Sequence, residues 1–303
     1  MLEHILVPLD GSPAAEAVLP YAAYLAKQLG VEMTLLHIIE PDELRTRSEE
    51  HQAYLDQLQQ NAEAAARSYL ESQAQQLREQ GVSVAISVHY GKPADVLLAH
   101  GETAPAGNHV IALTTHGRSG GLALALLGSV TDRLLHGARS PLLVVHPREG
   151  VTGGPLTRIT VPLDGSPLAE GALPLASELA KRLRLPMSLV WVVPVAAVVY
   201  GGPGPYPSNL LADIQDAAKT YLQEVCERLR REGIEADFEV LIHHGAAAGI
   251  IEHTGGRSDQ LVAMSTHGRS GLDRWLLGSV TNRVVRSGVS PVLVVRPEAG
   301  TSS

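Results

Sequence analysis

Residues 265–279 read Ser-Thr-His-Gly-Arg-Ser-Gly-Leu-Asp-Arg-Trp-Leu-Leu-Gly-Ser, and residues 114–129 are a near copy with one residue more. We call these two segments the glycine loops. Apolar residues 261–264 lead into the second loop, and Gly278-Ser279 opens a segment of helical periodicity, so the predicted order is strand, loop, helix. Glycine lets main-chain amides approach an anion, and a helix N-terminus adds unpaired N–H donors and partial positive charge. The pattern therefore favours binding of nucleotide phosphates.

The chain is a tandem duplication. Val-Pro-Leu-Asp-Gly-Ser-Pro occurs at residues 7–13 and again at 161–167, and Leu-Leu-Gly-Ser-Val-Thr occurs at residues 126–131 and 276–281. A self-similarity that spans the chain indicates two copies of one domain fused head to tail. We predict domains at residues 1–148 and 158–298, with a short flexible connector around residues 149–155.

Composition limits the classes of function. The 303 residues are 45% hydrophobic, which suits two domains with substantial cores, and the net charge is −8. No run of Lys and Arg forms a basic stripe, so nucleic acid is disfavoured as a partner. The single cysteine, Cys226, excludes an internal disulfide framework and fits a reducing compartment. No signal peptide or membrane span is visible, and we expect a cytoplasmic protein without a membrane partner.

Apolar runs alternate with helical periodicity in each copy. Strands are expected at residues 5–9, 34–39, 82–88, 110–113 and 142–145, and correspondingly in the second copy, where the last four are 188–193, 238–242, 261–264 and 292–295. The third strands have the alternating character of edge strands. A long, partly solvated helix is expected over residues 48–80, and a kink at Pro20 and at Pro174. A plain surface loop is favoured over a mobile flap for residues 201–207.

These elements predict an α/β fold made of two tandem doubly wound five-stranded parallel sheets, because crossover connections of this length impose parallel pairing. Ligands on such sheets bind beyond the carboxyl ends of the strands, where the winding reverses. Asp10 and Asp164, at the ends of the first strands, are therefore expected to face the same crevice as the glycine loops.

Both copies resemble the universal stress protein family over essentially the whole chain. The resemblance lies in the opening Val-Pro-Leu-Asp-Gly-Ser, the glycine loop followed by Gly-Ser-Val-Thr, and the closing Ser-Pro before the last strand. It implies a tandem member with a Rossmann-like, adenine nucleotide alpha hydrolase-like fold that binds ATP, with or without Mg²⁺. It also implies an internal pseudo-dimer formed through the fifth strands, which can dimerise again.

Family members hold ATP through a pattern of Gly, two residues, Gly, nine residues, then Gly and Ser or Thr. The second copy fits from Gly268 to Ser279, except that Ser265 replaces the leading glycine. In the first copy Thr114 replaces that glycine, and ten residues separate Gly117 from Gly128. An extra residue in a helical segment rotates every later residue by about a quarter turn. We therefore rank the second site above the first.

The resemblance assigns Asp164 and Val192 to ribose and adenine, and the glycine loop to the phosphates, with Asp10 and Ile38 as counterparts. The predicted second site is Pro162, Leu163, Asp164, Val192, Ser265, Gly268, Arg269, Gly278, Ser279, Val280 and Thr281. The predicted first site is Pro8, Leu9, Asp10, Ile38, Thr114, Gly117, Arg118, Gly128, Ser129, Val130 and Thr131.

Each feature also has a structural alternative. Asp10 and Asp164 can cap the following helices, Arg118 and Arg269 can be solvated surface charges, and His116 and His267 fit a structural hydrogen bond better than catalysis. The Gly-x-Ser-x-Gly match at residues 117–121 is broken in the second copy, which disfavours a serine hydrolase. His243, His244 and His253 match no metal-ligand spacing. No Walker-type lysine is present in the loops, so fast nucleotide hydrolysis has no visible catalyst.

Three hypotheses of function are consistent with these patterns. The first is a stress-response regulatory protein that binds ATP in one or both domains, with occupancy changing conformation or assembly together with an unidentified protein partner. The second is a slow Mg-dependent ATPase or phosphotransfer enzyme. The third is a nucleotide-free interaction scaffold. We favour the first, with recognition rather than turnover as its purpose.

Overall fold

The computed structural model describes residues 1–40, 49–103, 108–117, 127–148, 153–195, 210–266 and 277–297. The first half contains β1 (His4–Pro8), α1 (Pro13–Glu16), α2 (Leu19–Leu29), β2 (Glu32–Ile39), α3 (Glu49–Glu79), β3 (Val84–Tyr90), α4 (Pro93–Thr103), β4 (His109–Thr114), α5 (Ser129–Gly137) and β5 (Leu142–Val145). The second half contains β6 (Arg158–Pro162), α6 (Pro167–Glu170), α7 (Leu173–Leu183), β7 (Met187–Pro194), α9 (Leu210–Arg231), β8 (Ala236–His243), α10 (Ala246–His253), β9 (Gln260–Ser265), α11 (Ser279–Ser287) and β10 (Val292–Val295).

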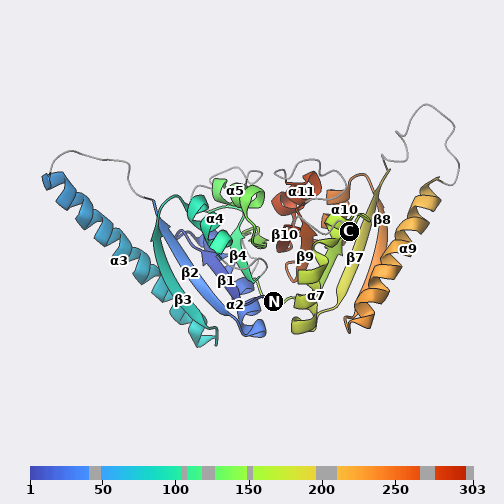
Figure 1. Ribbon diagram of the computed structural model, residues 1–303, viewed down its shortest axis with the longest axis horizontal. Coiled ribbons are helices and arrows are strands. Elements are labelled where there is room, and N and C mark those ends of the chain that lie inside the picture. The colour runs from blue at the N-terminus through green and yellow to red at the C-terminus, as the bar shows by residue number, and fades with distance from the viewer. Residues whose placement is uncertain are drawn as a thin grey trace, which may run out of the picture.

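The ten described strands form one sheet, in the order β3-β2-β1-β4-β5-β10-β9-β6-β7-β8 (Figure 1). Pairing is parallel within each half, and β5 meets β10 in the single antiparallel pair of this sheet, where Leu143 faces Leu293. The two predicted five-stranded parallel sheets are confirmed, as are the edge positions of β3 and β8. The fifth strands join the halves as the family resemblance implied.

The sheet order explains where a ligand site belongs. In the first half the chain moves from β1 outward to β2 and β3, then returns to β4 on the other side of β1. The second half does the same from β6 to β9. The winding therefore reverses between β1 and β4 and between β6 and β9, and loops that leave these strand ends diverge to opposite faces of the sheet and open a crevice.

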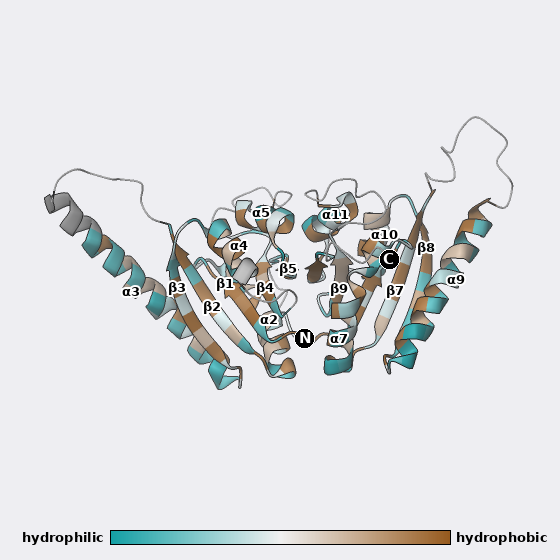
Figure 2. Ribbon diagram, viewed as in Figure 1, coloured by the Kyte–Doolittle hydropathy of each residue, from teal (hydrophilic) through white to brown (hydrophobic). Residues whose placement is uncertain are grey.

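Apolar side chains fill both faces of the sheet. One core cluster lies on the side of α2, α3, α7 and α9 and includes Val7, Leu70 and Leu222; the other lies on the side of α4, α5, α10 and α11 and includes Leu36, Ile111 and Leu134. The central strands β4, β5 and β10 are buried along their whole length. Figure 2 shows these inner strands as largely hydrophobic, as expected where helices cover both faces.

The proline positions correct one prediction. The helix after the first strand is not kinked at Pro20; it ends, and α2 begins at Leu19 with Pro20 in its first turn. Pro174 occupies the same place in α7. A first-turn proline lacks an N–H that would have no intrahelical partner in any case, so it favours the start of a new helix over a bend.

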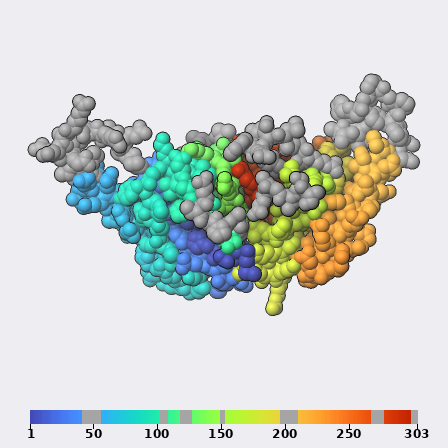
Figure 3. All heavy atoms as spheres, in the orientation of Figure 1, coloured from blue at the N-terminus to red at the C-terminus, as the bar shows by residue number. Residues whose placement is uncertain are grey.

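The long helix is confirmed. α3 buries Ala66, Leu70, Ala74 and Leu77, whereas residues 56–62 are exposed. Its N-terminal part extends beyond the end of β3 (Figure 1). In the space-filling view the two halves lie side by side, with α3 and α9 at opposite ends of the molecule (Figure 3). Within the described residues, no helix has both the length and the apolar character needed to cross a membrane.

Candidate functional site

One aspartate follows the first strand of each half: Asp10 lies after β1 and Asp164 after β6. Asp10 Oδ1 accepts hydrogen bonds from the main-chain N–H of Ser12 at 2.9 Å and from its Oγ at 2.6 Å. Asp164 makes the same two contacts with Ser166, at 3.0 and 2.6 Å. The serine oxygens in turn accept from the N–H groups of Ala15 and Ala169 and so cap α1 and α6. The aspartates therefore orient the capping serines and do not cap the helices themselves.

The second carboxylate oxygen of Asp10 lies against the start of the glycine loop. A Cβ atom placed on Gly117 would be 2.3 Å from Asp10 Oδ2, which is far inside van der Waals contact. Only glycine lets the backbone pass the aspartate at this distance. Asp10 and Gly117, which are distant in sequence, are thus brought together where the winding reverses, as predicted.

Each glycine loop ends at a helix start that is tied to the preceding strand. Gly128 N–H donates to the carbonyl of Thr115 at 2.8 Å, and Gly278 N–H donates to the carbonyl of Thr266 at 2.7 Å. The hydroxyls of Thr131 and Thr281 donate to the carbonyls of Thr114 and Ser265, at 2.7 and 2.9 Å. Four groups of the predicted site residues therefore already have protein partners.

The remaining donors at these helix starts are main-chain amides. No side chain caps the N-terminus of α5 or α11 among the described residues. The first amides of an α-helix lack intrahelical acceptors, so the N–H groups of Ser129 and Val130, and of Ser279 and Val280, are the ones suited to an anion. Ser129 and Ser279, the first residues of these helices, are exposed to solvent.

Apolar residues line the adjoining strand ends. Leu9 and Leu163 are buried, and their N–H groups donate to the carbonyls of Leu36 and Val190 at 2.8 and 2.9 Å. Pro8 and Pro162 end β1 and β6 and are half-buried. Ile38 on β2 and Val192 on β7 are half-buried and pack on the same core cluster as Val130 and Val280. The predicted adenine and phosphate residues therefore share one side of the sheet.

Two histidines beside the first loop have a structural role. Thr115 Oγ1 lies 2.9 Å from His116 Nδ1 and 2.9 Å from His146 Nδ1. One hydroxyl has a single proton and two lone pairs, so at most one imidazole accepts from Thr115 and at least one ring donates to it through Nδ1–H. Burial lowers the pKa of His146, with nearby Arg148 and His116 lowering it further. This bridge supports the structural interpretation of His116.

Several predicted features lie outside the described residues. These are Arg118, Gly268, Arg269, His267, the serine of the Gly-x-Ser-x-Gly match, and residues 201–207. Within the described part of the chain, no group of three or more His, Cys, Asp or Glu side chains is arranged to hold a metal ion.

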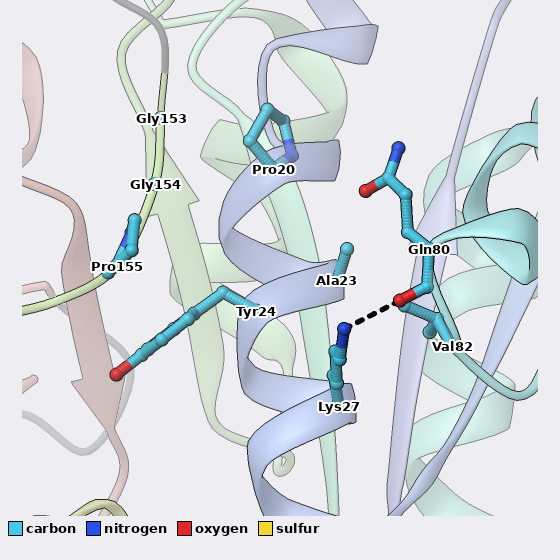
Figure 4. Close-up of a pocket in the computed structure, with 9 residues that line it drawn as sticks. All are labelled: Pro20, Ala23, Tyr24, Lys27, Gln80, Val82, Gly153, Gly154 and Pro155. Atoms are coloured by element: carbon cyan, nitrogen blue, oxygen red, sulfur yellow. Dashed lines mark hydrogen bonds between the residues drawn. The ribbon is translucent and has the colours of Figure 1, made fainter.

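A cavity of about 220 Å³ lies elsewhere, between α2, the turn at Gln80 and the interdomain connector (Figure 4). Lys27 Nζ donates to the carbonyl of Gln80 at 2.7 Å beside it. None of its lining residues belongs to the predicted sites.

The sequence did not predict that the main-chain carbonyls of Thr115 and Thr266 accept hydrogen bonds from the N–H groups of Gly128 and Gly278. Every residue has a main-chain carbonyl, so the residue types at these positions gave no signal for the contact. The sequence also did not predict two contacts from the second half to α5, made by Arg286 and Arg296.

The comparisons with known proteins agree in both halves. The model of the universal stress protein family matches residues 1–146 and 155–296. A universal stress protein of Mycobacterium tuberculosis (strain CDC 1551 / Oshkosh) is 28% identical over 306 residues, covering 96% of this chain and 94% of the relative. One from Mycolicibacterium smegmatis is 29% identical over 301 residues, covering 97% of each. The crystal structure of a universal stress protein from Archaeoglobus fulgidus has a TM-score of 0.67 at 22% identity, covering 97% of this chain and 98% of that one, and shows the same fold.

Proposed function

The chain belongs to the universal stress protein family, and from that premise we propose that it is a cytoplasmic stress-response regulator that binds ATP in its tandem crevices. Occupancy of the crevices changes the conformation or assembly of the protein. ATP is held for recognition rather than for rapid turnover.

The observation that carries the proposal is the meeting of Asp10 with Gly117 beside the uncapped start of α5. A carboxylate is a suitable acceptor for ribose hydroxyls, and the second oxygen of Asp10 lies toward the loop. Two main-chain amides at the helix start are suitable donors to phosphate oxygens. Asp164, Gly278 and α11 repeat the described part of this arrangement in the second half.

The two sites are not equivalent in charge. Asp132 lies in the first turn of α5, whereas the first turn of α11 carries no acidic residue and has Asn282 in the matching position. A carboxylate close to a phosphate group weakens anion binding at a helix start. This difference supports the ranking of the second site above the first.

Calorimetric titration of nucleotide-stripped protein with Mg-ATP tests the proposal, and mass spectrometry of the stripped material identifies any nucleotide that co-purifies. Asp164→Asn keeps an oxygen that can accept from Ser166 but removes the charge, so it should weaken ATP binding without unfolding α6. Asp216→Asn, at an exposed position on α9, is the matched control. Complete absence of binding would favour the scaffold hypothesis, and steady release of ADP that Asp164→Asn abolishes would favour the enzyme.

A further inference from the structure

The helices α5 and α11 start the same way but differ at the positions that face the junction between the halves. Asp132 and His136 on α5 correspond to Asn282 and Arg286 on α11, and His146 after β5 corresponds to Arg296 after β10. In a tandem repeat, equivalent positions of the two copies face each other across the junction. Where the residues at such positions differ, the two halves can make different contacts with each other.

The second half contacts α5 at two places. Arg286 Nη2 lies 3.7 Å from Asp132 Oδ1, in the first turn of α5. Arg296 Nη2 donates a short hydrogen bond to the carbonyl of His136, in the last turn of the same helix. Asp132 also has His136 Nδ1 at 3.8 Å from its other oxygen. One helix of the first half is therefore held near both ends by guanidinium groups of the second half.

The matching residues of the first half make different contacts. His146, in the place of Arg296, has its Nδ1 engaged with Thr115 Oγ1 inside its own half. His136, in the place of Arg286, has its Nδ1 2.7 Å from the carbonyl of Asp132 on its own helix. Asn282, in the place of Asp132, offers a neutral amide. The described contacts of these three residues thus do not reproduce the hold on α5.

Both contacts bear on the helix start that faces the first crevice. Arg286 offsets the charge of Asp132, which otherwise opposes an anion at the first turn. Arg296 is a cation at a helix C-terminus, where charge-assisted bonding to a carbonyl fixes the helix and complements its dipole. α5 has nine residues and is only about 13 Å long, so its two ends move as one body.

We infer that the second domain holds α5 through Arg286 and Arg296 and thereby sets the affinity of the first site for phosphate-bearing ligands. The Arg286 pair joins both helices, whereas the Arg296 contact with α5 has no counterpart from His146 to α11 among the described contacts. The identity of that ligand as ATP rests on the proposed function. Loss of the Arg286 contact should act through Asp132, and loss of the Arg296 contact should act through the position of α5.

The test separates the sites by disabling one at a time. Gly278→Val leaves the first site, and Gly128→Val leaves the second; each background then receives Arg286→Gln or Arg296→Gln, and Mg-ATP affinity is measured by calorimetry. We expect both arginine substitutions to weaken the first site about twofold to fivefold, the range that charges at helix termini produce, and Arg296→Gln to leave the second site unchanged. Equal weakening of both sites by Arg296→Gln would overturn the inference.

A double-mutant cycle identifies the charge effect. Asp132→Asn installs the residue found at position 282 and should strengthen the first site, after which Arg286→Gln should have no further effect. Arg286→Lys keeps the charge and should restore most of the affinity. If Arg286→Gln weakens the first site equally in the presence and absence of Asp132, the proposed route through Asp132 is wrong.

Hydrogen exchange distinguishes failure of the inference from failure of the proposed function. Arg296→Gln should speed amide exchange in α5 but not in α11, and this readout requires no ligand. Unchanged exchange in α5 would overturn the inference whether or not ATP binds. Faster exchange in α5 with no ATP binding in either background would overturn the proposed function and leave the hold on α5 intact.

Discussion

At the scale of single residues, the close approach of Gly117 to Asp10 is the sharpest constraint on the first site. The carboxylate is already fixed on one side by the two bonds from Ser12. It therefore has little freedom to retreat from any atom added at Gly117. This makes a methyl group at position 117 a precise probe of the crevice.

Gly117→Ala should displace Asp10 and weaken ATP binding at the first site, measured by titration in the Gly278→Val background. The expected loss of stability is roughly 1–3 kcal/mol, as for other overpacked positions, and thermal unfolding measures it. Gly154→Ala is the control, because a Cβ atom there meets nothing within 4 Å. Equal effects of the two substitutions would show that the approach of Asp10 to Gly117 is not a constraint.

Thr281 tests how the loop is held. Its side chain is buried and donates to the carbonyl of Ser265 at 2.9 Å. Thr281→Val should lower the free energy of unfolding by roughly 1–3 kcal/mol, because it removes the buried hydrogen bond from the hydroxyl to that carbonyl. Thr281→Ser keeps the hydroxyl and should lose less, as urea denaturation followed by circular dichroism would measure. A Val variant as stable as the unsubstituted protein would show that the hydrogen bond of Thr281 does not stabilise the fold.

At the scale of elements, the two halves differ beneath α4 and α10. In the first half this face of the sheet is rich in histidine: His4 Nε2 lies 2.9 Å from Thr34 Oγ1, His109 Nε2 lies 3.0 Å from Ser140 Oγ, and the rings of His89 and His100 are 5.1 Å apart. Burial lowers the pKa of His4, His100 and His109. Neighbouring histidines lower the pKa of His100 and His109 further, whereas Glu32 partly offsets the effect of burial on His4.

The second half places charge pairs on the same face. Arg158, which matches His4, lies 2.6 Å from Asp237, and His253 lies 3.1 Å from Glu239. These acids stand at the β8 positions that match Ala85 and Ser87 on β3, since both sets pair with equivalent β2 and β7 residues. The acidic partners present in one half are thus absent from the matching strand of the other.

Acid should therefore loosen the first half before the second. A histidine whose folded pKa is depressed binds its proton more readily when unfolded, so stability falls as pH drops through the ordinary value near 6.5 and stops falling below the folded pKa. Hydrogen exchange at pH 7.5 and 5.5 should show lost protection in α4 and β4 but not in α10 and β9. His109→Gln, which installs the residue found at Gln260, should reduce the effect. Equal loss in both halves would contradict this account.

The sequence predicted most elements because their signals are local or repeated. Apolar runs bounded by turn residues gave the strands, and the 154-residue recurrence of Asp10 at Asp164 placed both crevices. The hydrogen bond from the Gly128 N–H to the Thr115 carbonyl could not be predicted, because it depends on how closely the end of β4 approaches α5. Pro20 was misinterpreted because a proline that starts a second helix has the same spacing as one that kinks a single helix. The Arg296 contact was hidden because it joins different domains.

At the scale of the whole molecule, the N-terminus of the first half is clamped by α7 of the second. Leu2 N–H donates to Glu178 Oε1 at 2.8 Å, and Arg182 Nη1 donates to the carbonyl of Leu2 at 2.9 Å. Tyr21 adds a bond from its hydroxyl to the carbonyl of Ser258 at 3.0 Å. These contacts and the α5 contacts lie on opposite faces of the sheet. Each face therefore has its own contacts between the halves.

Arg182→Met should lower the free energy of unfolding by roughly 1–3 kcal/mol, because it removes the charge-assisted bonds from Arg182 to the carbonyls of Leu2 and Leu29 and its contact with Glu178 at 3.2 Å. Differential scanning calorimetry should show a lower Tm and a broader transition as the halves begin to unfold separately. Arg231→Met, at an exposed position on α9, is the control. An equal drop in Tm in the control variant would show that the contacts of Arg182 do not specifically stabilise the protein.

The antiparallel pairing of β5 with β10 within one chain makes the contact between the halves independent of the protein concentration. Two separate chains that met along these strands would part on dilution, and any communication between their ligand sites would fade with them. Because one polypeptide supplies both strands, the local concentration of each half around the other is set by the short connector and not by the amount of protein in the cell. Communication between the crevices would therefore persist in a cell that holds only a few copies.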